Sequence, residues 1–161
     1  MSFAAVQRIL GILLTVFSLT LLPPFVLALL AQDGAAVAFA TAFALTLGVG
    51  ILSWLPVRGM KRELRLRDGF IVVVMFWTVL SAIGALPFVL ADNPHLSLTD
   101  AVFESVSGLT TTGATVITSL DGLPMSILYY RQQLQWLGGM GIIVLAVAVL
   151  PMLGIGGMQL Y

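Results

Sequence analysis

Long uncharged apolar runs alternate with short polar segments along this chain. Residues 9–31, 34–56 and 69–91 contain no charged side chain, and a fourth run over 124–151 is apolar apart from a polar stretch in its first half. About 20 apolar residues are enough to cross the roughly 30 Å hydrocarbon core of a membrane as a helix. Each run therefore predicts a membrane-spanning helix.

The first two runs predict a hairpin. The turn between them, residues 31–34, is very short, so the two helices have to lie antiparallel. The first run is too long for the apolar region of a cleaved signal peptide, which spans about 7–15 residues. Pro23 and Pro24 are expected to kink this helix, because each lacks a backbone N–H and crowds the preceding turn.

The segment between the third and fourth runs is too polar for a span and too apolar for a free loop. Ser97 followed by Asp100 matches a capping box, which marks the start of a helix. The apolar spacing that follows predicts a helix over 98–109. At 1.5 Å per residue this helix is about 17 Å long, roughly half the membrane.

A half-length helix followed by extended chain is typical of a re-entrant pore loop. Irregular backbone at membrane depth is tolerated only where it is buried in protein or lines water. The segment 110–115, with sequence TTTGAT, has the chemistry of an ion filter. Backbone carbonyls and threonine hydroxyls supply uncharged oxygen ligands, and Gly113 permits a positive φ. The plainer interpretation is an ordinary polar loop.

Composition narrows the class of protein further. Of 161 residues, 60% are hydrophobic and only 9% are charged, whereas soluble domains carry about 25% charged residues. The mean hydropathy is +1.10. These values exclude a soluble domain and intrinsic disorder, and they predict an all-α integral membrane protein. The chain has no cysteine and one histidine, so it offers no thiolate or histidine-cluster metal site.

The charges are sorted along the chain, although the formal net charge is zero. Five of the seven basic residues lie in 58–67, between two predicted spans. A short basic loop of this kind stays on the cytoplasmic side, and Arg8 agrees with an internal N-terminus. The flanking spans argue against a nucleic-acid partner. Alternation of the spans then places both termini inside. The acidic residues that fall outside are Asp33, Asp92, Asp100, Glu104 and Asp121.

Two motifs carry a family resemblance. They are FESVSGLTTTGAT over 103–115 and YRQQLQWLGGMGI over 130–142, with GIGGMQ near the end of the chain. With these motifs the chain resembles the membrane subunit of Trk-type bacterial potassium uptake systems, the TrkH/KtrB group. It is most similar to the TrkH branch, because an extra hairpin precedes the first pore unit.

In that family four helix–pore loop–helix repeats surround one pore. The resemblance implies that this chain is an N-terminal fragment with one K⁺-channel-like repeat. We therefore expect an N-terminal hairpin (1–57), a basic cytoplasmic loop (58–68), a first pore repeat (69–152) and a truncated cytoplasmic end (153–161). Within the repeat we expect an outer helix at 69–91, a pore helix at 98–109, a filter at 110–115 and an inner helix at 124–151.

The resemblance also implies the site. The K⁺-binding filter falls on Thr110, Thr111, Thr112 and Gly113, and the backbone carbonyls of Thr111 and Thr112 are the expected metal ligands. K⁺ is the transported ion, without a cofactor and without enzymatic activity, and transport is classed as symport in the bacterial inner membrane. The expected partners are the three remaining repeats, a cytosolic nucleotide-binding regulatory subunit, a second full-length copy in a homodimer, and membrane lipid.

Several residues keep two interpretations. Glu104 either supports the filter or forms a structural bond to the backbone or to an adjacent helix, since a buried acid needs a partner. Arg131 is expected to extend to the outer interface, and its alternative is an ion pair with Glu104 or Asp121. Gly138, Gly139 and Gly141 favour close helix packing, with a bending hinge as the alternative.

Three functions compete at this point. The first is K⁺ uptake, with this chain supplying one of four filter segments of the pore. The second is a subunit of a homotetrameric cation channel. The third is a non-conducting membrane scaffold whose polar loop only packs externally.

Overall fold

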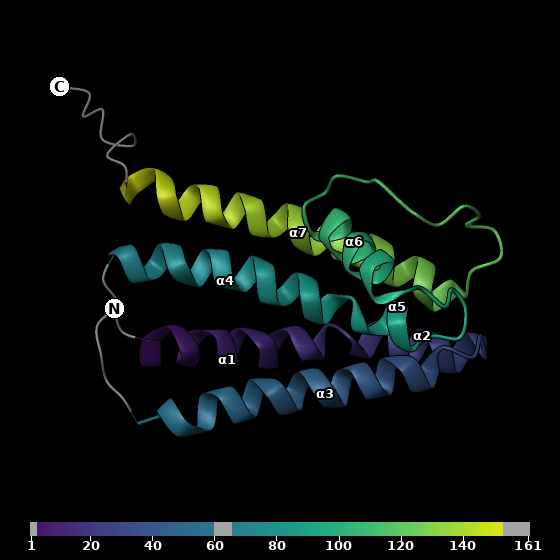
Figure 1. Ribbon diagram of the computed structural model, residues 1–161, viewed down its shortest axis with the longest axis horizontal. Coiled ribbons are helices and arrows are strands. Elements are labelled where there is room, and N and C mark those ends of the chain that lie inside the picture. Colours follow the sequence, from purple (N-terminus) through teal and green to yellow (C-terminus); the bar gives the residue numbers. More distant parts are fainter. Residues whose placement is uncertain (1–2, 60–65, 153–161) are drawn as a thin grey trace.

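The computed structural model describes residues 3–59 and 66–152, and within these ranges every regular element is helical (Figure 1). The elements are α1 (Phe3–Leu19), α2 (Leu22–Ala31), α3 (Ala36–Trp54), the 3-10 turn η1 (Leu55–Val57), α4 (Leu66–Gly84), α5 (Leu86–Leu90), α6 (Leu98–Leu109) and α7 (Met125–Met152). The predicted all-α class is confirmed. The predicted end 153–161 and most of the basic loop 58–68 lie outside the described residues.

Three helical stretches of the described part are long and apolar enough to cross a membrane. They are Phe3–Ala31, Ala36–Val57 and Asp68–Leu90. Figure 1 shows that α1 and α4 begin at the same end of the molecule at which α3 and α7 finish. The turn after α2 and the long segment after α6 reach the opposite end, so the helices alternate in direction as expected.

The first stretch is broken where the proline pair predicts a kink. Helix α1 ends at Leu19 and α2 begins at Leu22, directly before Pro23 and Pro24. Pro24 has no N–H to donate to the carbonyl of Thr20, four residues earlier. The side chain of Gln133 on α7 replaces that donor, because its Nε2 donates to the Thr20 carbonyl at 2.5 Å.

A second break, which the sequence pattern did not predict, divides the third stretch. Helix α4 ends at Gly84 and α5 begins at Leu86. The N–H of Phe88 bonds to the carbonyl of Ala85 at 3.1 Å, and so the Gly84 carbonyl loses its helical donor. The hydroxyl of Tyr130 on α7 donates to that carbonyl at 2.6 Å. Two side chains of one helix therefore complete the backbone of two broken spans.

Close packing joins α1 to α3. A Cβ atom on Gly11 would lie 2.9 Å from the carbonyl oxygen of Gly50, and a Cβ on Gly50 would lie 2.7 Å from the hydroxyl of Thr15. Any larger residue at either position would force the two backbones apart. Small residues allow this close approach between membrane helices, and here they hold the N-terminal hairpin together.

Asp33, in the hairpin turn, caps the N-terminus of α7. Its carboxylate accepts the backbone N–H of Ser126 at 2.9 Å and that of Ala35 at 3.0 Å. Burial alone would raise the pKa of Asp33, but these N–H groups stabilise the charged form, and the pKa falls below its ordinary value. The cap is therefore complete above the ordinary aspartate pKa and is lost only as pH falls through the lowered value.

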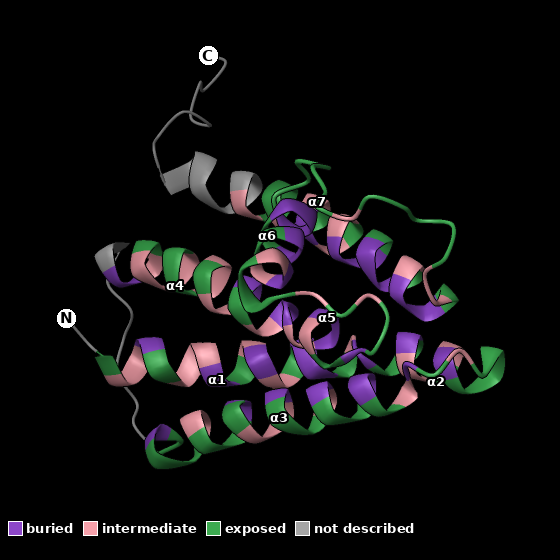
Figure 2. Ribbon diagram, turned by 45° about the vertical axis from the view of Figure 1, so that its right-hand side comes forward, coloured by how far each residue is buried: buried purple, intermediate pink, exposed green. Residues whose placement is uncertain are grey.

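The core forms around Tyr130. Its ring lies edge-on to Phe39, with centroids 5.4 Å apart, and tilted against Phe88 at 5.3 Å. All three rings are fully buried. Figure 2 shows the buried positions lining the inner faces where α1, α3, α5, α6 and α7 meet. The first half of α7 thus occupies the centre of the fold.

The first half of helix α7 is polar. The helix covers nearly all of the predicted range 124–151. Its first half carries Arg131 and the glutamines Gln132, Gln133 and Gln135. Arg131 and Gln133 are buried among neighbouring helices, whereas Gln132 is exposed.

We predict that Tyr130→Phe destabilises the full-length protein containing this segment. The substitution removes only the hydroxyl and leaves the buried Gly84 carbonyl unpaired, which costs about 1–3 kcal/mol. The matched control is Tyr129→Phe, because Tyr129 is exposed and its hydroxyl makes no hydrogen bond within the described residues. Thermal unfolding in detergent measures the effect. Equal shifts of Tm for the two variants would contradict this role.

Candidate functional site

The short helix α6 begins at the predicted capping box. The hydroxyl of Ser97 accepts the backbone N–H of Asp100 at 3.2 Å and donates to its carboxylate at 2.8 Å. The helix then runs over Leu98–Leu109, the bounds that the sequence predicts. Asp100 also complements the positive end of the helix dipole. The cap thus fixes where this half-length helix starts.

The segment after α6 closes the helix on itself. The N–H of Thr111 bonds to the carbonyl of Gly108 at 2.9 Å, and that of Thr112 bonds to the carbonyl of Ser107 at 2.9 Å. This pair of bonds is a Schellman motif, in which the residue at the position of Thr111 is usually glycine. Thr111 has φ 57°, which costs a side chain about 1–2 kcal/mol. Strain of this kind clusters at functional sites.

Four successive carbonyl groups after the helix are left without a partner. The carbonyls of Thr110, Thr111, Thr112 and Gly113 accept no hydrogen bond within the described residues, and all four residues are exposed. Gly113 has φ 76°, so the positive φ expected of this glycine is present. The carbonyl of Ala114, next in the chain, is instead bonded to the hydroxyl of Ser107 at 2.6 Å.

The threonine hydroxyls of this segment mostly brace the loop. Thr110 donates to the carbonyl of Val106 at 2.7 Å, and the hydroxyls of Thr110 and Thr112 lie 2.7 Å apart. The hydroxyl of Thr115 is taken by Glu104. The oxygens left free for a ligand are therefore chiefly backbone carbonyls, and not the hydroxyls that the sequence also suggests.

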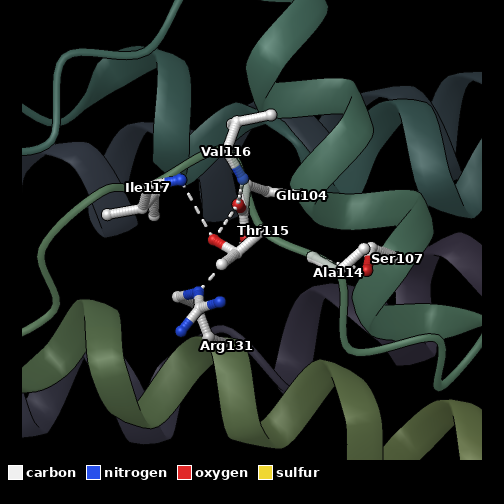
Figure 3. Close-up of polar contacts among 7 residues, drawn as sticks. All are labelled: Glu104, Ser107, Ala114, Thr115, Val116, Ile117 and Arg131. Atoms are coloured by element: carbon white, nitrogen blue, oxygen red, sulfur yellow. Dashed lines mark hydrogen bonds and ion pairs between the residues drawn. The ribbon is translucent and has the colours of Figure 1, made fainter.

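Glu104 connects three parts of the site (Figure 3). Its carboxylate accepts the hydroxyl of Thr115, the N–H of Val116 at 2.7 Å and the Nε–H of Arg131 at 3.2 Å. Glu104 is 4% exposed and Arg131 is 7% exposed. The pair joins α6, the outgoing limb of the loop and α7.

The expectation that Arg131 extends to the outer interface is therefore wrong. Its guanidinium lies buried beside Glu104, the alternative that the sequence left open. A carboxylate buried at this depth without a partner costs several kcal/mol, and the Arg131 guanidinium offsets part of that cost. Asp121 is exposed and takes no part in this pair.

The glycines of α7 differ in how closely they are packed. A Cβ on Gly138 would lie 2.0 Å from the carbonyl oxygen of Leu109, so only glycine fits where α7 meets the end of α6. A Cβ on Gly139 would lie 3.7 Å from the methyl group of Thr111, and one on Gly141 would lie 3.4 Å from the ring of Trp77. Close packing thus requires glycine at position 138, whereas Gly139 and Gly141 have room for a small side chain.

The sequence pattern did not indicate every contact of this site. It gave no sign of the hydrogen bond from the Ser107 hydroxyl to the Ala114 carbonyl, because any residue of an irregular segment supplies such a carbonyl. Gln133 did leave a signal. A proline pair inside a span frees carbonyl groups that need an outside donor, and an amide in a neighbouring apolar helix is the natural source.

Comparison with known proteins assigns the chain to a family. A family profile described as TrkH, cation transport protein, matches residues 35–161. The chain belongs to the TrkH family. The family resemblance seen in its motifs is confirmed.

Individual relatives agree with that membership. The chain is 62% identical to the Trk system potassium uptake protein TrkH of Vibrio parahaemolyticus, over 100% of this chain and 33% of the relative. It is 57% identical to the Escherichia coli K12 protein of the same name, again over 33% of the relative. The chain spans about a third of the length of these relatives.

A solved structure matches the fold. The crystal structure of the potassium transporter TrkH from Vibrio parahaemolyticus superposes with a TM-score of 0.91 at 61% identity, covering 99% of this chain and 34% of the other. The helical arrangement described above is therefore that of one part of a TrkH-family transporter.

We predict that Glu104→Gln destabilises the full-length protein more than the double variant Glu104→Gln with Arg131→Gln. The single variant leaves a buried guanidinium unpaired, at a cost of about 3–5 kcal/mol, whereas the double variant removes both charges. Thermal unfolding of the two variants and of Arg131→Gln alone gives the coupling between the residues. Additive losses across this cycle would refute the buried pair.

Proposed function

We propose that this chain supplies one of four filter segments of a pore that carries K⁺ into the cell. The observation that carries the proposal is the row of four unpaired carbonyls at Thr110, Thr111, Thr112 and Gly113, which follows a capped half-length helix. Relatives described as potassium uptake proteins support K⁺ as the ion. The activity is transport with no cofactor, and not enzymatic catalysis.

The carbonyl row suits a dehydrated cation. Carbonyl oxygens replace the hydration shell of K⁺ in selective pores. The C-terminal end of α6 faces the same segment and contributes partial negative charge. We assign the carbonyls of Thr111 and Thr112 as the metal ligands at the centre of the row, with Thr110 and Gly113 at its two ends.

Glu104 and Arg131 act as filter support in this proposal. The Glu104 carboxylate holds Thr115 and Val116, which follow the carbonyl row directly. Arg131 neutralises that carboxylate and fixes its position against α7. The pair therefore anchors the outgoing limb of the loop without offering a charge to the passing ion.

The proposed orientation places both termini in the cytoplasm of a bacterium, with the protein in the inner membrane. Arg8 lies in the first half of α1 and Arg58 directly follows η1, whereas Asp33 lies in the turn after α2 and Asp92 follows α5. Figure 1 shows the start of α1 and the end of α3 at one end of the molecule, and the turn after α2 at the other. Basic residues are retained on the cytoplasmic side. An inside-negative potential then favours K⁺ entry by about 2.3 kcal/mol per 100 mV.

The proposed partners are those that would cover the surfaces that a single repeat leaves exposed. The filter segment Thr110–Thr115 is exposed, and irregular backbone at membrane depth needs protein around it. We propose that three further repeats of the full-length chain close the ring, and that lipid covers the outer helices. The proposed assembly also contains a cytosolic nucleotide-binding regulatory subunit and a second full-length copy in a homodimer. Ion coupling by symport is proposed for this complete assembly and not for the present segment alone.

We predict that Gly113→Ala alters uptake and ion preference. A side chain at φ 76° is strained by about 1–2 kcal/mol, which corresponds to a factor of about 5–30. The measurement is Rb⁺ uptake, and its inhibition by Na⁺, in cells that lack other K⁺ uptake and express the full-length protein. The control is Gly122→Ala, at a position with equally open space and no positive φ. Unchanged uptake and preference in Gly113→Ala would count against the filter.

A further inference from the structure

Ser107 holds both sides of the carbonyl row. It lies in the last turn of α6 and is 5% exposed. Its backbone carbonyl accepts the N–H of Thr112 at 2.9 Å, and its hydroxyl donates to the carbonyl of Ala114 at 2.6 Å. One residue is therefore bonded before and after Gly113, the most permissive point of the segment.

We propose that Ser107 is a positioning residue that sets the outer limit of the ion filter at Gly113. The inference rests on the proposed function. By holding the Ala114 carbonyl against α6, the Ser107 hydroxyl keeps that oxygen away from the ion path, while the four carbonyls before it stay free. The number of coordinating oxygens is thereby fixed by a side chain of the pore helix.

The hydrogen bond of Ser107 is unusual among the helical hydroxyls of this chain. A hydroxyl in a helix commonly bonds to a carbonyl three or four residues earlier in the same helix. In the described helices Thr15, Ser18, Thr46 and Thr78 all do so. Ser107 instead reaches forward by seven residues into the loop, so its bond orients the loop and not merely its own hydroxyl.

Ion preference depends on this control. K⁺ is distinguished from Na⁺ by the size of the cavity that the carbonyls enclose or by the number and field strength of these carbonyls, and both depend on which carbonyls face the ion. Gly113 has no side chain to restrict the backbone, so the hydrogen bonds on either side of it have to restrict the backbone instead. Glu104 holds the side chain of Thr115 and the N–H of Val116 but no carbonyl of the row. Ser107 is the side chain that directly positions a carbonyl adjoining the row.

The test uses Ser107→Ala in the full-length protein. Rb⁺ uptake is measured against Rb⁺ concentration and against competing Na⁺, normalised to the amount of folded protein in the membrane. We expect maximal Rb⁺ uptake within twofold of the parent and Na⁺ inhibition at least fivefold stronger. Ser107→Cys, which keeps a weak donor, is expected to fall between the two and provides a second variant of nearly unchanged volume.

The matched control is Ser105→Ala. Ser105 lies on the same helix and is fully buried, and its hydroxyl has no hydrogen-bond partner in the described part of the chain. It should leave Na⁺ inhibition unchanged. An equal effect of Ser105→Ala, or a loss of maximal uptake in Ser107→Ala without stronger Na⁺ inhibition, overturns the role of Ser107.

The outcome also separates this inference from the proposed function. If Ser107→Ala keeps the parental ion preference while Gly113→Ala changes it, the filter stands and the positioning role is refuted. If neither variant changes uptake or preference, the filter assignment itself fails.

Discussion

Backbone N–H and carbonyl groups at membrane depth have to find partners within the protein, because the hydrocarbon core supplies no water to bond them. This constraint explains two long-range polar contacts in the described part of the chain. The proline pair after α1 frees a carbonyl that Gln133 takes, and the break between α4 and α5 frees another that Tyr130 takes. The carbonyls of Thr110, Thr111, Thr112 and Gly113, in contrast, accept no hydrogen bond within the described residues. In the proposed function these oxygens are left free for an ion.

Helix α7 provides the side chains that bond to the carbonyls freed at the two helix breaks. It receives the Asp33 cap at its start, completes two broken helices, and neutralises Glu104 through Arg131. At Gly138 its backbone then touches the end of α6. The N-terminal hairpin and the segment after α6 thus contact the same helix, and the polar side chains in its first half make several of these contacts.

Local sequence patterns predicted what local physics determines. The capping box of Ser97 and the apolar spacing after it predicted a helix over 98–109, and the structure has those bounds. The kink before Pro23 was predictable for the same reason, since proline acts on its own turn. The positive φ of Gly113 was expected from the residue type alone.

Contacts between distant residues were not predictable in this way. Arg131 could extend to the membrane surface or pair with an acid, and the choice depends on where a residue 27 positions away comes to lie. The bond of Gln133 to Thr20 spans 113 positions. Which threonine hydroxyls bond within the loop also depends on the loop geometry. The run of three threonines does not reveal that geometry.

The central claim is that the unpaired carbonyls bind the transported ion. Anomalous diffraction from crystals of the full-length protein grown with Rb⁺ tests it most directly. The account predicts Rb⁺ peaks beside the carbonyls of Thr110–Gly113 and none coordinated by Ala114. Absence of ion density along this row, with its carbonyls bonded to other parts of the protein, would contradict the account.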